Sequence, residues 1–429
     1  METVLYPPKE SWEGLCRRPL LDVPALDKSV RTILDRVRKE GDRAVRKYSN
    51  QFDNVDLTEF KVSPREADEA IEKIPEKLRQ AISTAKNNIE RFHSSQICGM
   101  NVIETMPGVK CWRKNIPLDV AGLYVPGGIT PLFSTLLMLA IPARIAGCGR
   151  IIICTPPAAD GTINPIVLYA AGITGITEIY KVGGAHAIAA MAYGTETIPQ
   201  VNKIFGPGNQ YVTKAKELVQ SDGIAIDMPA GPSEALVIAD SGADPAYVAA
   251  DLLSQAEHGP DSQVVLLTDN REMISSVNIE IGKQLQQLPR KSIADHSILN
   301  SLAILFSDME ECLEFSNRYA PEHLIINTTN APQLAGKVAN AGSVFIGRYS
   351  CESVGDYASG PNHTLPTNGF ARSFSGVSVD SFVRKVTFQE ISEEGLANIG
   401  PSVVAMAEAE GLEGHGNAVR IRLKDIRNV

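Results

Sequence analysis

The chain has 429 residues, of which 44% are hydrophobic and 21% are charged, and its formal net charge is −9 at pH 7. This length exceeds what one hydrophobic core usually supports, and the composition is that of an ordinary soluble globular protein, so we expect two or more domains. The negative charge argues against nucleic acid as a partner, because there is no basic stripe to neutralise phosphate groups.

The cysteines and the N-terminus indicate the compartment. No two cysteines form a Cys-x-x-Cys pair, so they are interpreted as reduced thiols rather than as a disulfide framework or a thiolate zinc site. The N-terminus has neither a basic start nor an apolar core, and no apolar run is long enough to span a membrane. We therefore expect a cytoplasmic protein without a membrane partner. The seven cysteines are at positions 16, 98, 111, 148, 154, 312 and 351.

Three kinds of segment precede residue 130. Residues 1–22 are interpreted as an irregular arm, and the pattern from 26 to about 91 is helical. Short strands are expected near 108–112 and 120–125.

Helices and strands then alternate along the chain. Continuous β-branched strands between helices predict parallel sheets covered on both faces, and hence two Rossmann-like α/β units. Beyond Gly376 a Glu-rich tail fits neither sheet. The expected strands are 150–155, 178–182, 203–205, 235–239, 263–268, 302–306, 324–327 and 343–346; the expected helices are 131–146, 164–171, 185–193, 209–220, 245–257 and 271–288.

Two glycine-rich turns follow expected strands and precede helices: residues 124–128 (YVPGG) and 206–209 (GPGN). Glycine lets the backbone approach a ligand closely, and a helix N-terminus favours phosphate. Neither turn is the G-x-G-x-x-G fingerprint, and ordinary βα turns explain them equally well.

The helix expected over 245–257 ends in the sequence QAEH. Gln255 and His258 are three residues apart, so their side chains lie on one side of the last turn and can share a metal ion. A solvated helix end is the ordinary alternative. Asp356 in a glycine-rich loop and His415 between two glycines of the tail would complete a ligand set without thiolate, which suits a catalytic metal.

Glu322 and His323 adjoin one another where a helix gives way to a strand. Histidine titrates near neutral pH and is the commonest general base, and a neighbouring glutamate can hold a water molecule. A surface glutamate beside a half-buried histidine is the alternative. His363 follows near Asp356 and is a candidate for orienting the site.

Longer strings of residues are more specific than single motifs. These strings are residues 124–128, 206–209, 227–234 (DMPAGPSE), 253–262 (LSQAEHGPDS), 317–324 (NRYAPEHL), 355–360 (GDYASG) and 410–415 (EGLEGH). In these strings, in order and over essentially its whole length, the chain closely resembles the histidinol dehydrogenases.

The resemblance implies a role for each matching residue. Glu322 and His323 would be the acid/base pair, and one Zn²⁺ per subunit would be held by Gln255, His258, Asp356 and His415. NAD would meet Tyr124, Asn209 and the position of His186, where the family more usually carries glutamine. L-Histidinol would contact Ser233, Gln255, His258, His323, Asp356, Glu410 and His415.

The resemblance also implies a domain arrangement and a homodimer. A first Rossmann-like domain would be discontinuous (23–123 and 235–376), with the second, NAD-binding domain (124–234) inserted in it. The tail domain, 377–429, would exchange between subunits and bring Glu410 and His415 into the partner's site.

The expected reaction is a four-electron oxidation of L-histidinol through L-histidinaldehyde to L-histidine with two NAD in sequence, in the last steps of histidine biosynthesis. His323 would take the alcohol proton, and Glu322 would activate water at the aldehyde stage. Three alternatives stay open: a relative that oxidises another small alcohol, a zinc hydrolase without cofactor, and a non-catalytic nucleotide-binding protein.

Overall fold

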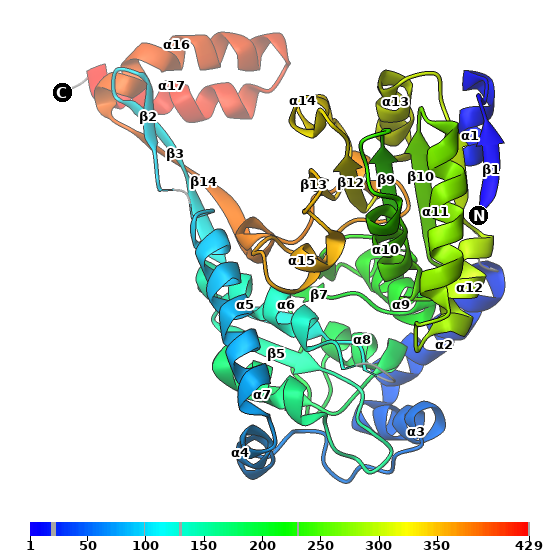
Figure 1. Ribbon diagram of the computed structural model, residues 1–429. Coiled ribbons are helices and arrows are strands. Elements are labelled where there is room, and N and C mark those ends of the chain that lie inside the picture. Colours follow the sequence, from blue (N-terminus) through cyan, green and yellow to red (C-terminus); the bar gives the residue numbers. More distant parts are fainter. Residues whose placement is uncertain (19–22, 98, 128–130, 230, 428–429) are drawn as a thin grey trace. The chain divides into compact units, whose positions relative to one another are not determined.

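A computed structural model describes residues 1–18, 23–97, 99–127, 131–229 and 231–427 (Figure 1). The chain divides into two compact units, the first formed by Met1–Gln96 and Asp119–Phe382 and the second by Ile97–Leu118 and Val383–Val429. Within the described residues, no helix combines the length and the apolar character that crossing a lipid bilayer requires.

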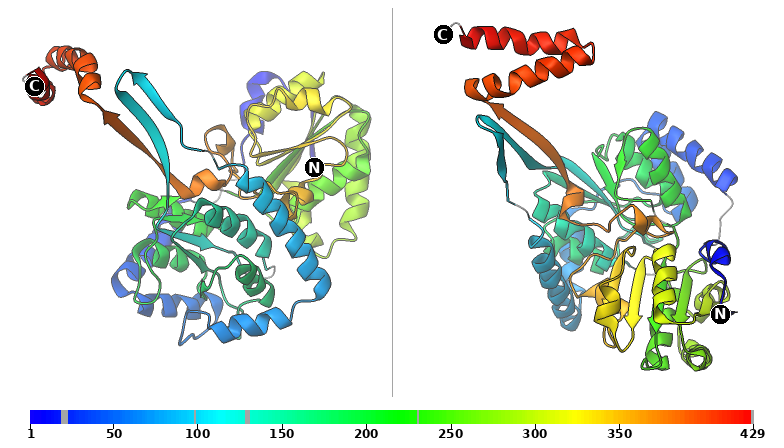
Figure 2. Two further views of the ribbon diagram at one scale, coloured as in Figure 1. Left: turned by 90° about the vertical axis from the view of Figure 1, so that its left-hand side faces the viewer. Right: turned by 90° about the horizontal axis from the view of Figure 1, so that it is seen from above.

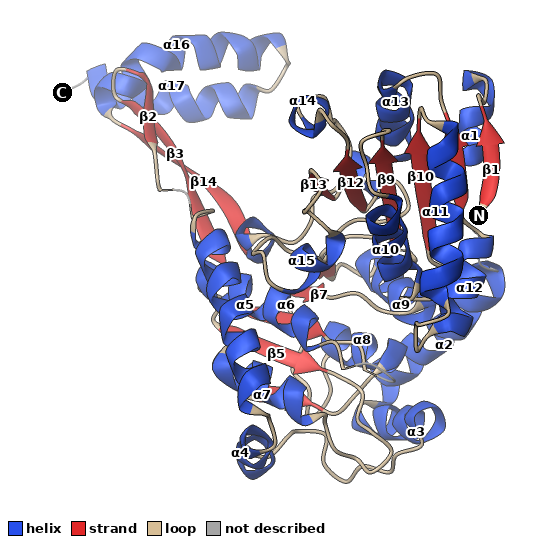
Figure 3. Ribbon diagram, viewed as in Figure 1, coloured by secondary structure: helices blue, strands red, loops and turns tan. Residues whose placement is uncertain are grey.

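The first unit contains a six-stranded parallel sheet in the order β1-β11-β10-β9-β12-β13 (Figure 3). The strands are β1 (Glu2–Leu5), β9 (Glu234–Ala239), β10 (Gln263–Thr268), β11 (Leu302–Leu305), β12 (His323–Asn327) and β13 (Ser343–Ile346). The helices of this part are α1 (Trp12–Leu15), α10 (Pro245–Ala256), α11 (Arg271–Leu285), α12 (Lys291–Leu299), α13 (Met309–Tyr319), α14 (Ala331–Ala335) and α15 (Glu352–Tyr357), with short 3-10 turns at Lys9–Ser11, Phe370–Arg372 and Val379–Phe382.

Both faces of this sheet are buried, as its unbroken apolar strands require. Alternate residues of each strand point to opposite faces, so Val237 and Val264 pack with α10, α11 and α12, whereas Leu236 and Val265 pack with α13 and Trp12. The views of Figure 2 show the sheet between its helices.

The same unit contains a five-stranded parallel sheet in the order β6-β5-β4-β7-β8. Residues of α2, α3, α8 and α9 share one apolar cluster with its strands, and α6 packs against α5, α7 and β4. The strands are β4 (Val120–Tyr124), β5 (Arg150–Cys154), β6 (Glu178–Tyr180), β7 (Lys203–Phe205) and β8 (Ala225–Ile226); the helices are α2 (Val23–Glu40), α3 (Asp42–Asp53), α4 (Pro64–Glu72), α5 (Glu76–Ser94), α6 (Phe133–Ala146), α7 (Pro165–Ile173), α8 (Gly184–Tyr193) and α9 (Gln210–Ser221).

The second unit is a three-stranded antiparallel sheet followed by two helices. Strand β14 (Val383–Ile391) pairs with β3 (Val109–Pro117), which pairs with β2 (Val102–Met106). Helices α16 (Glu393–Ala409) and α17 (Glu413–Arg427) pack against each other.

The fold class predicted from the alternating pattern is confirmed, since both large sheets are parallel and covered by helices. Three details of the predicted organisation differ. The arm is partly ordered, because β1 pairs with β11 at the sheet edge. Strand β4 lies before the predicted boundary at residue 124 but pairs with β5 and β7. Helices α2 and α3 share an apolar cluster with that same sheet, and α4 and α5 pack against its helices α7 and α6. The tail contributes a strand to a third sheet that no pattern indicated. The last four residues of the predicted arm lie outside the described residues.

Candidate functional site

The Glu322–His323 pair lies where the chain leaves α13 and enters β12, as the sequence predicted. Ala320 caps the helix in the left-handed conformation, with φ at +53°, and the chain then turns into the strand that His323 begins. His323 is paired in register with Ala235 of β9 and Ser343 of β13. Both site residues therefore lie at the amino-terminal edge of the six-stranded sheet.

Both side chains of the pair are buried, with 7% of Glu322 and 3% of His323 exposed. The Glu322 carboxylate accepts hydrogen bonds from the Glu234 backbone N–H at 3.0 Å and from the Gln255 amide at 3.3 Å. The Nδ1 atom of His323 lies 3.4 Å from the Glu234 carbonyl oxygen and 3.6 Å from the Glu322 carboxylate. The alternative of a surface pair is therefore wrong.

Gln255 and His258 come to this edge because α10 starts at the opposite edge and runs back along the sheet. Asp244 caps the helix by accepting from the Ala246 N–H, with Pro245 in the first turn. Gln255 lies buried in the last turn, and His258 follows the helix and is exposed. The Gln255 amide nitrogen donates to Glu322, and its Oε1 has no hydrogen-bond partner among the described residues.

Asp356 comes from α15, a short helix rather than the loop that its glycine-rich surroundings predicted. Glu352 precedes Asp356 by one helical turn, so the two carboxylates lie on one side of α15. Helix α15 packs against α10. Asp356 Oδ1 lies 3.4 Å from His323 Nε2, without the geometry of a hydrogen bond.

Together these residues form a cluster that suits a cation. Ligand atoms of His258, Glu352 and Asp356 lie within 4.8 Å of one another. Asp356 Oδ1, Glu352 Oε2 and Gln255 Oε1 are all buried acceptors without a hydrogen-bond partner in the described part of the chain. Buried acceptors without donors are costly unless a positive charge compensates them, so these residues fit a divalent metal ion.

The electrostatics of the cluster agree with that interpretation. Burial and the neighbouring carboxylates of Asp356 and Glu322 raise the pKa of Glu352 well above its ordinary value. Burial opposes protonation of His323, but the carboxylates of Glu352, Glu322 and Asp356 outweigh burial and raise the pKa of His323. Burial would raise the pKa of Asp356, but the neighbouring imidazoles lower it. This concentration of buried negative charge favours a bound cation.

His363 holds the backbone beside Asp356. Its Nδ1 lies 2.8 Å from the Asp356 carbonyl oxygen, and its Nε2 lies 3.2 Å from the Thr135 hydroxyl on α6. The contact with the Asp356 carbonyl oxygen is consistent with the interpretation that His363 orients the site.

The residues expected to meet NAD lie at the carboxyl edge of the five-stranded sheet. Tyr124 ends β4, and its hydroxyl accepts from the Gly184 N–H at the start of α8 at 3.0 Å. Asn209 caps α9 by accepting from the N–H groups of Tyr211 and Val212. Edges of this kind are the usual ligand sites of parallel α/β sheets. Gly128, the last residue of the YVPGG turn, and Ala230 of the DMPAGPSE string lie outside the described residues.

His186 is 1% exposed in α8. Its Nε2 lies 3.2 Å from the Ser49 hydroxyl and 3.7 Å from an Asp53 carboxylate oxygen. Burial lowers the pKa of His186 to about 3, so the imidazole stays neutral near pH 7. Its Nδ1 has no hydrogen-bond partner among the described residues.

The remaining candidates for substrate or metal contacts come from two other segments of the chain. Ser233 directly precedes β9, and its carbonyl oxygen accepts from the Gln263 N–H. Glu410 and His415 belong to the second unit, where both are exposed. His415 lies inside α17, although a glycine precedes it and another follows it.

Two features of the site were missed from the sequence. Glu352 has the i, i+4 spacing to Asp356 that would have indicated a shared helical face, but the glycines hid the helix. Glu234, the last letter of the DMPAGPSE string, touches both Glu322 and His323 through its backbone, and no sequence signal indicates a backbone contact.

Comparisons with known proteins agree on one family. The sequence profile of the family "Histidinol dehydrogenase" matches residues 16–423. Histidinol dehydrogenase from Bacteroides fragilis is 54% identical over 427 residues and covers 100% of both chains. The chloroplastic enzyme of Arabidopsis thaliana is 51% identical over 417 residues, which cover 96% of this chain and 89% of that protein. The crystal structure of histidinol dehydrogenase from Elizabethkingia anophelis superposes with a TM-score of 0.97 at 53% identity, covering 100% of this chain and 99% of that one.

Proposed function

The chain belongs to the histidinol dehydrogenase family, and from this premise we propose that it is a zinc-bound, NAD-dependent enzyme. It oxidises L-histidinol to L-histidinaldehyde and then to L-histidine. The observation that supports this most directly is the buried Glu322–His323 pair beside a cluster of acceptor atoms that have no hydrogen-bond partner among the described residues.

We propose that Gln255, His258, Asp356 and His415 hold the metal. Zinc, when bound, orients the imidazole and amine of the substrate and supplies positive charge that offsets the buried carboxylates. The unpartnered Oε1 of Gln255 and Oδ1 of Asp356 are suitable oxygen ligands, and His258 is accessible from solvent. Ser233 and Glu410 would contribute further substrate contacts.

His323 would act as the base for the alcohol proton. A bound metal ion would offset the neighbouring carboxylates that raise the pKa of His323 and so favour the neutral ring. Its Nδ1 faces the Glu234 carbonyl oxygen, which can only accept, so in the neutral ring the proton would reside on Nδ1. The lone pair is then on Nε2, on the side of Asp356, where a substrate hydroxyl could be deprotonated.

Glu322 would activate water at the aldehyde stage. Its Oε2 is held by the Glu234 N–H and the Gln255 amide, which fixes the carboxylate without neutralising it. Burial of both residues limits access of bulk water, which would keep the reactive aldehyde enclosed.

NAD, when bound, accepts the hydride in each of the two oxidations. We propose that Tyr124, Asn209 and His186 form its site. The 206–209 turn lets the cofactor approach the backbone at the start of α9. His186 is held by Ser49 and stays neutral, so its contribution to the cofactor would be a hydrogen bond rather than a charge.

We further propose a homodimer in which Glu410 and His415 complete the partner's site. Mixing two inactive variants tests this: His323→Asn and His415→Asn, dissociated together and reassociated. If sites are shared, hybrids contain one intact site and the mixture recovers about a quarter of wild-type activity. If each chain builds its own site, the mixture stays inactive, and the contribution of the tail to the partner's site is excluded.

The reaction itself is tested by supplying the purified chain with histidinol and either NAD or NADP, with and without a chelator. NADH formation that stops on metal removal and returns with Zn²⁺ supports the proposal. A zinc hydrolase or a non-catalytic nucleotide-binding protein would produce no NADH under any of these conditions.

A further inference from the structure

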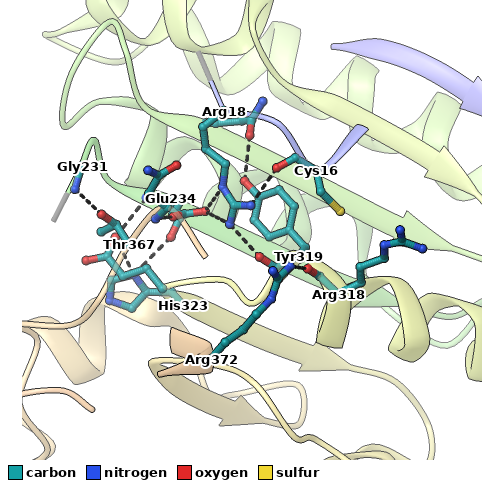
Figure 4. Close-up of polar contacts among 12 residues, drawn as sticks. Cys16, Arg18, Gly231, Glu234, Arg318, Tyr319, His323, Thr367 and Arg372 are labelled. Carbon is teal, nitrogen blue, oxygen red and sulfur yellow. Dashed lines mark hydrogen bonds and ion pairs between the residues drawn. The ribbon is translucent and has the colours of Figure 1, made fainter. Parts of the chain in front are cut away.

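We infer that Arg18 and Glu234 are positioning residues, which hold the backbone that orients Glu322 and His323 and so make the N-terminal segment part of the site (Figure 4). This inference rests on the proposed roles of Glu322 and His323.

Arg18 and Glu234 form a buried ion pair with hydrogen bonds from all three guanidinium nitrogens. The Nε and Nη2 atoms of Arg18 donate to one carboxylate oxygen of Glu234 at 2.9 and 2.6 Å, and the two side chains are 10% and 1% exposed. Nη1 donates to the Cys16 carbonyl oxygen and Nη2 also donates to the Tyr319 carbonyl oxygen, each at 2.8 Å. The guanidinium lies 3.5 Å from the centre of the Tyr319 ring. Figure 4 shows the two side chains next to each other.

This bonding fixes the orientation of Arg18 in several directions. Donors at Nε, Nη1 and Nη2 are all engaged, and the ring of Tyr319 covers the planar face. A lysine at this position could not make the same set of contacts, because an ammonium group has neither the plane nor the fork of a guanidinium.

The second carboxylate oxygen of Glu234 ties down a further segment. Its Oε1 accepts a short hydrogen bond from the Asn368 N–H, and the neighbouring Thr367 hydroxyl accepts from the Gly231 N–H. The side chain of Glu234 is therefore held on both oxygens, and the loop that ends at Asn368 is joined to the start of β9.

The backbone of Glu234 transmits this anchoring to the acid/base pair. Its N–H donates to the Glu322 carboxylate at 3.0 Å, and its carbonyl oxygen lies 3.4 Å from His323 Nδ1. One residue thus holds the orientation of the carboxylate and the tautomer of the imidazole. Movement of this peptide unit would disturb both groups, although Arg18 touches neither of them.

The alternative is that the ion pair stabilises the fold without positioning the acid/base residues, and this alternative predicts different results. Replacing a buried pair by apolar side chains of similar size is often neutral for stability. If the pair is only structural, a variant that keeps the fold should keep wild-type activity. If the pair positions the acid/base residues, activity should fall even in a variant that folds normally. The variants Arg18→Lys and the double variant Arg18→Met with Glu234→Leu separate the two roles.

The experiment compares both variants with wild type and with Lys9→Met. Lys9 lies in the same N-terminal segment and forms an ion pair with Glu314, but both side chains are more than half exposed and neither touches the site. Zinc content, the melting temperature, KM for NAD and kcat per zinc-loaded subunit are measured for each. We expect full zinc loading and unchanged KM for NAD in all four proteins, with kcat lowered about 10- to 100-fold in the two site variants only.

A second measurement does not depend on turnover. The tautomer of His323 is read from the ring nitrogen shifts in zinc-loaded ¹⁵N-labelled protein, at a pH at which these shifts show a neutral ring, with His323→Asn used to assign the signal. We expect the Nδ1–H form in wild type and Lys9→Met and a mixture of tautomers in the double variant. If wild type produces no NADH from histidinol, the proposed function fails, and the tautomer measurement still decides the positioning role. Wild-type kcat together with an unchanged tautomer in both site variants would overturn the inference.

Discussion

Gly206 offers a sharp test of how the proposed cofactor edge is built, because an alanine there meets the backbone itself. The residue follows β7 with φ at +121°, and a Cβ atom would lie 2.0 Å from the Tyr124 carbonyl oxygen and 3.0 Å from its carbonyl carbon. Two hydrogen bonds also hold the turn in place. The Gly206 N–H donates to Asp227 at 2.7 Å, and its carbonyl oxygen accepts from Lys216 Nζ at 2.8 Å.

The cost of Gly206→Ala follows from these contacts. The backbone conformation costs a residue with a Cβ atom about 1–3 kcal/mol. Relieving the clash requires the turn to move, which breaks at least one buried hydrogen bond to a charged group, worth about 1.5–3 kcal/mol. The expected loss in the free energy of unfolding is about 3–5 kcal/mol, or a fall in melting temperature on the order of 10 °C.

Thermal unfolding and NAD titration of the variant measure both consequences. Gly223→Ala is the matched control, because Gly223 has φ at +93° in the same part of the fold but a Cβ atom there meets nothing within 4 Å. We expect the free energy of unfolding of the control to fall only by the conformational cost, and we expect the control to bind NAD as wild type does. A Gly206→Ala protein that melts and binds NAD like the control would show that the contact with the Tyr124 carbonyl group does not constrain this turn.

Other changes test the acid/base pair and two buried groups. Glu322→Gln should slow conversion of added histidinaldehyde while zinc content stays stoichiometric, and loss of zinc would count against the proposed role. His323→Asn should abolish the first hydride transfer in a single turnover, so an unimpaired transfer would contradict a general base. Lys216→Met should cost about 3–5 kcal/mol in urea unfolding, because it leaves the buried Asp227 carboxylate unpaired, and adding Asp227→Asn should recover part of that loss; a loss no larger than that of an exposed lysine would disprove the pairing. Burial raises the pKa of Asp53 from its ordinary value of 3.8 to about 6, so ionisation between those values lowers stability as pH rises; Asp53→Asn should flatten this decline in melting temperature, and equal slopes in both proteins would exclude it.

Much of the fold follows from local sequence. The apolar runs of β9 and β10 and the Asp244–Pro245 start of α10 specify elements whose bounds agree with the structure within a residue or two. The short strand β1 was missed because its residues resemble any irregular arm, and its pairing with β11 depends on a contact 300 residues away in sequence. Local pattern carries no information on such pairing.

The site was predictable residue by residue but not as an assembly. Gln255 ends a crossover helix and His323 begins a strand, so both must lie at the amino edge of a parallel sheet. Their proximity depends on β12 lying beside β9, and that strand order is set by the whole fold. Arg18 shows the limit most clearly, since nothing local links it to Glu234.

We propose that this one protein performs both oxidations with bound zinc and NAD. The ratio of NADH to L-histidine formed from L-histidinol by the purified chain, before chelation, after chelation and after return of Zn²⁺, tests this proposal directly. We expect two NADH for each histidine, no product after chelation and recovery with zinc. One NADH with release of free aldehyde, or product formation that does not depend on metal, would contradict it.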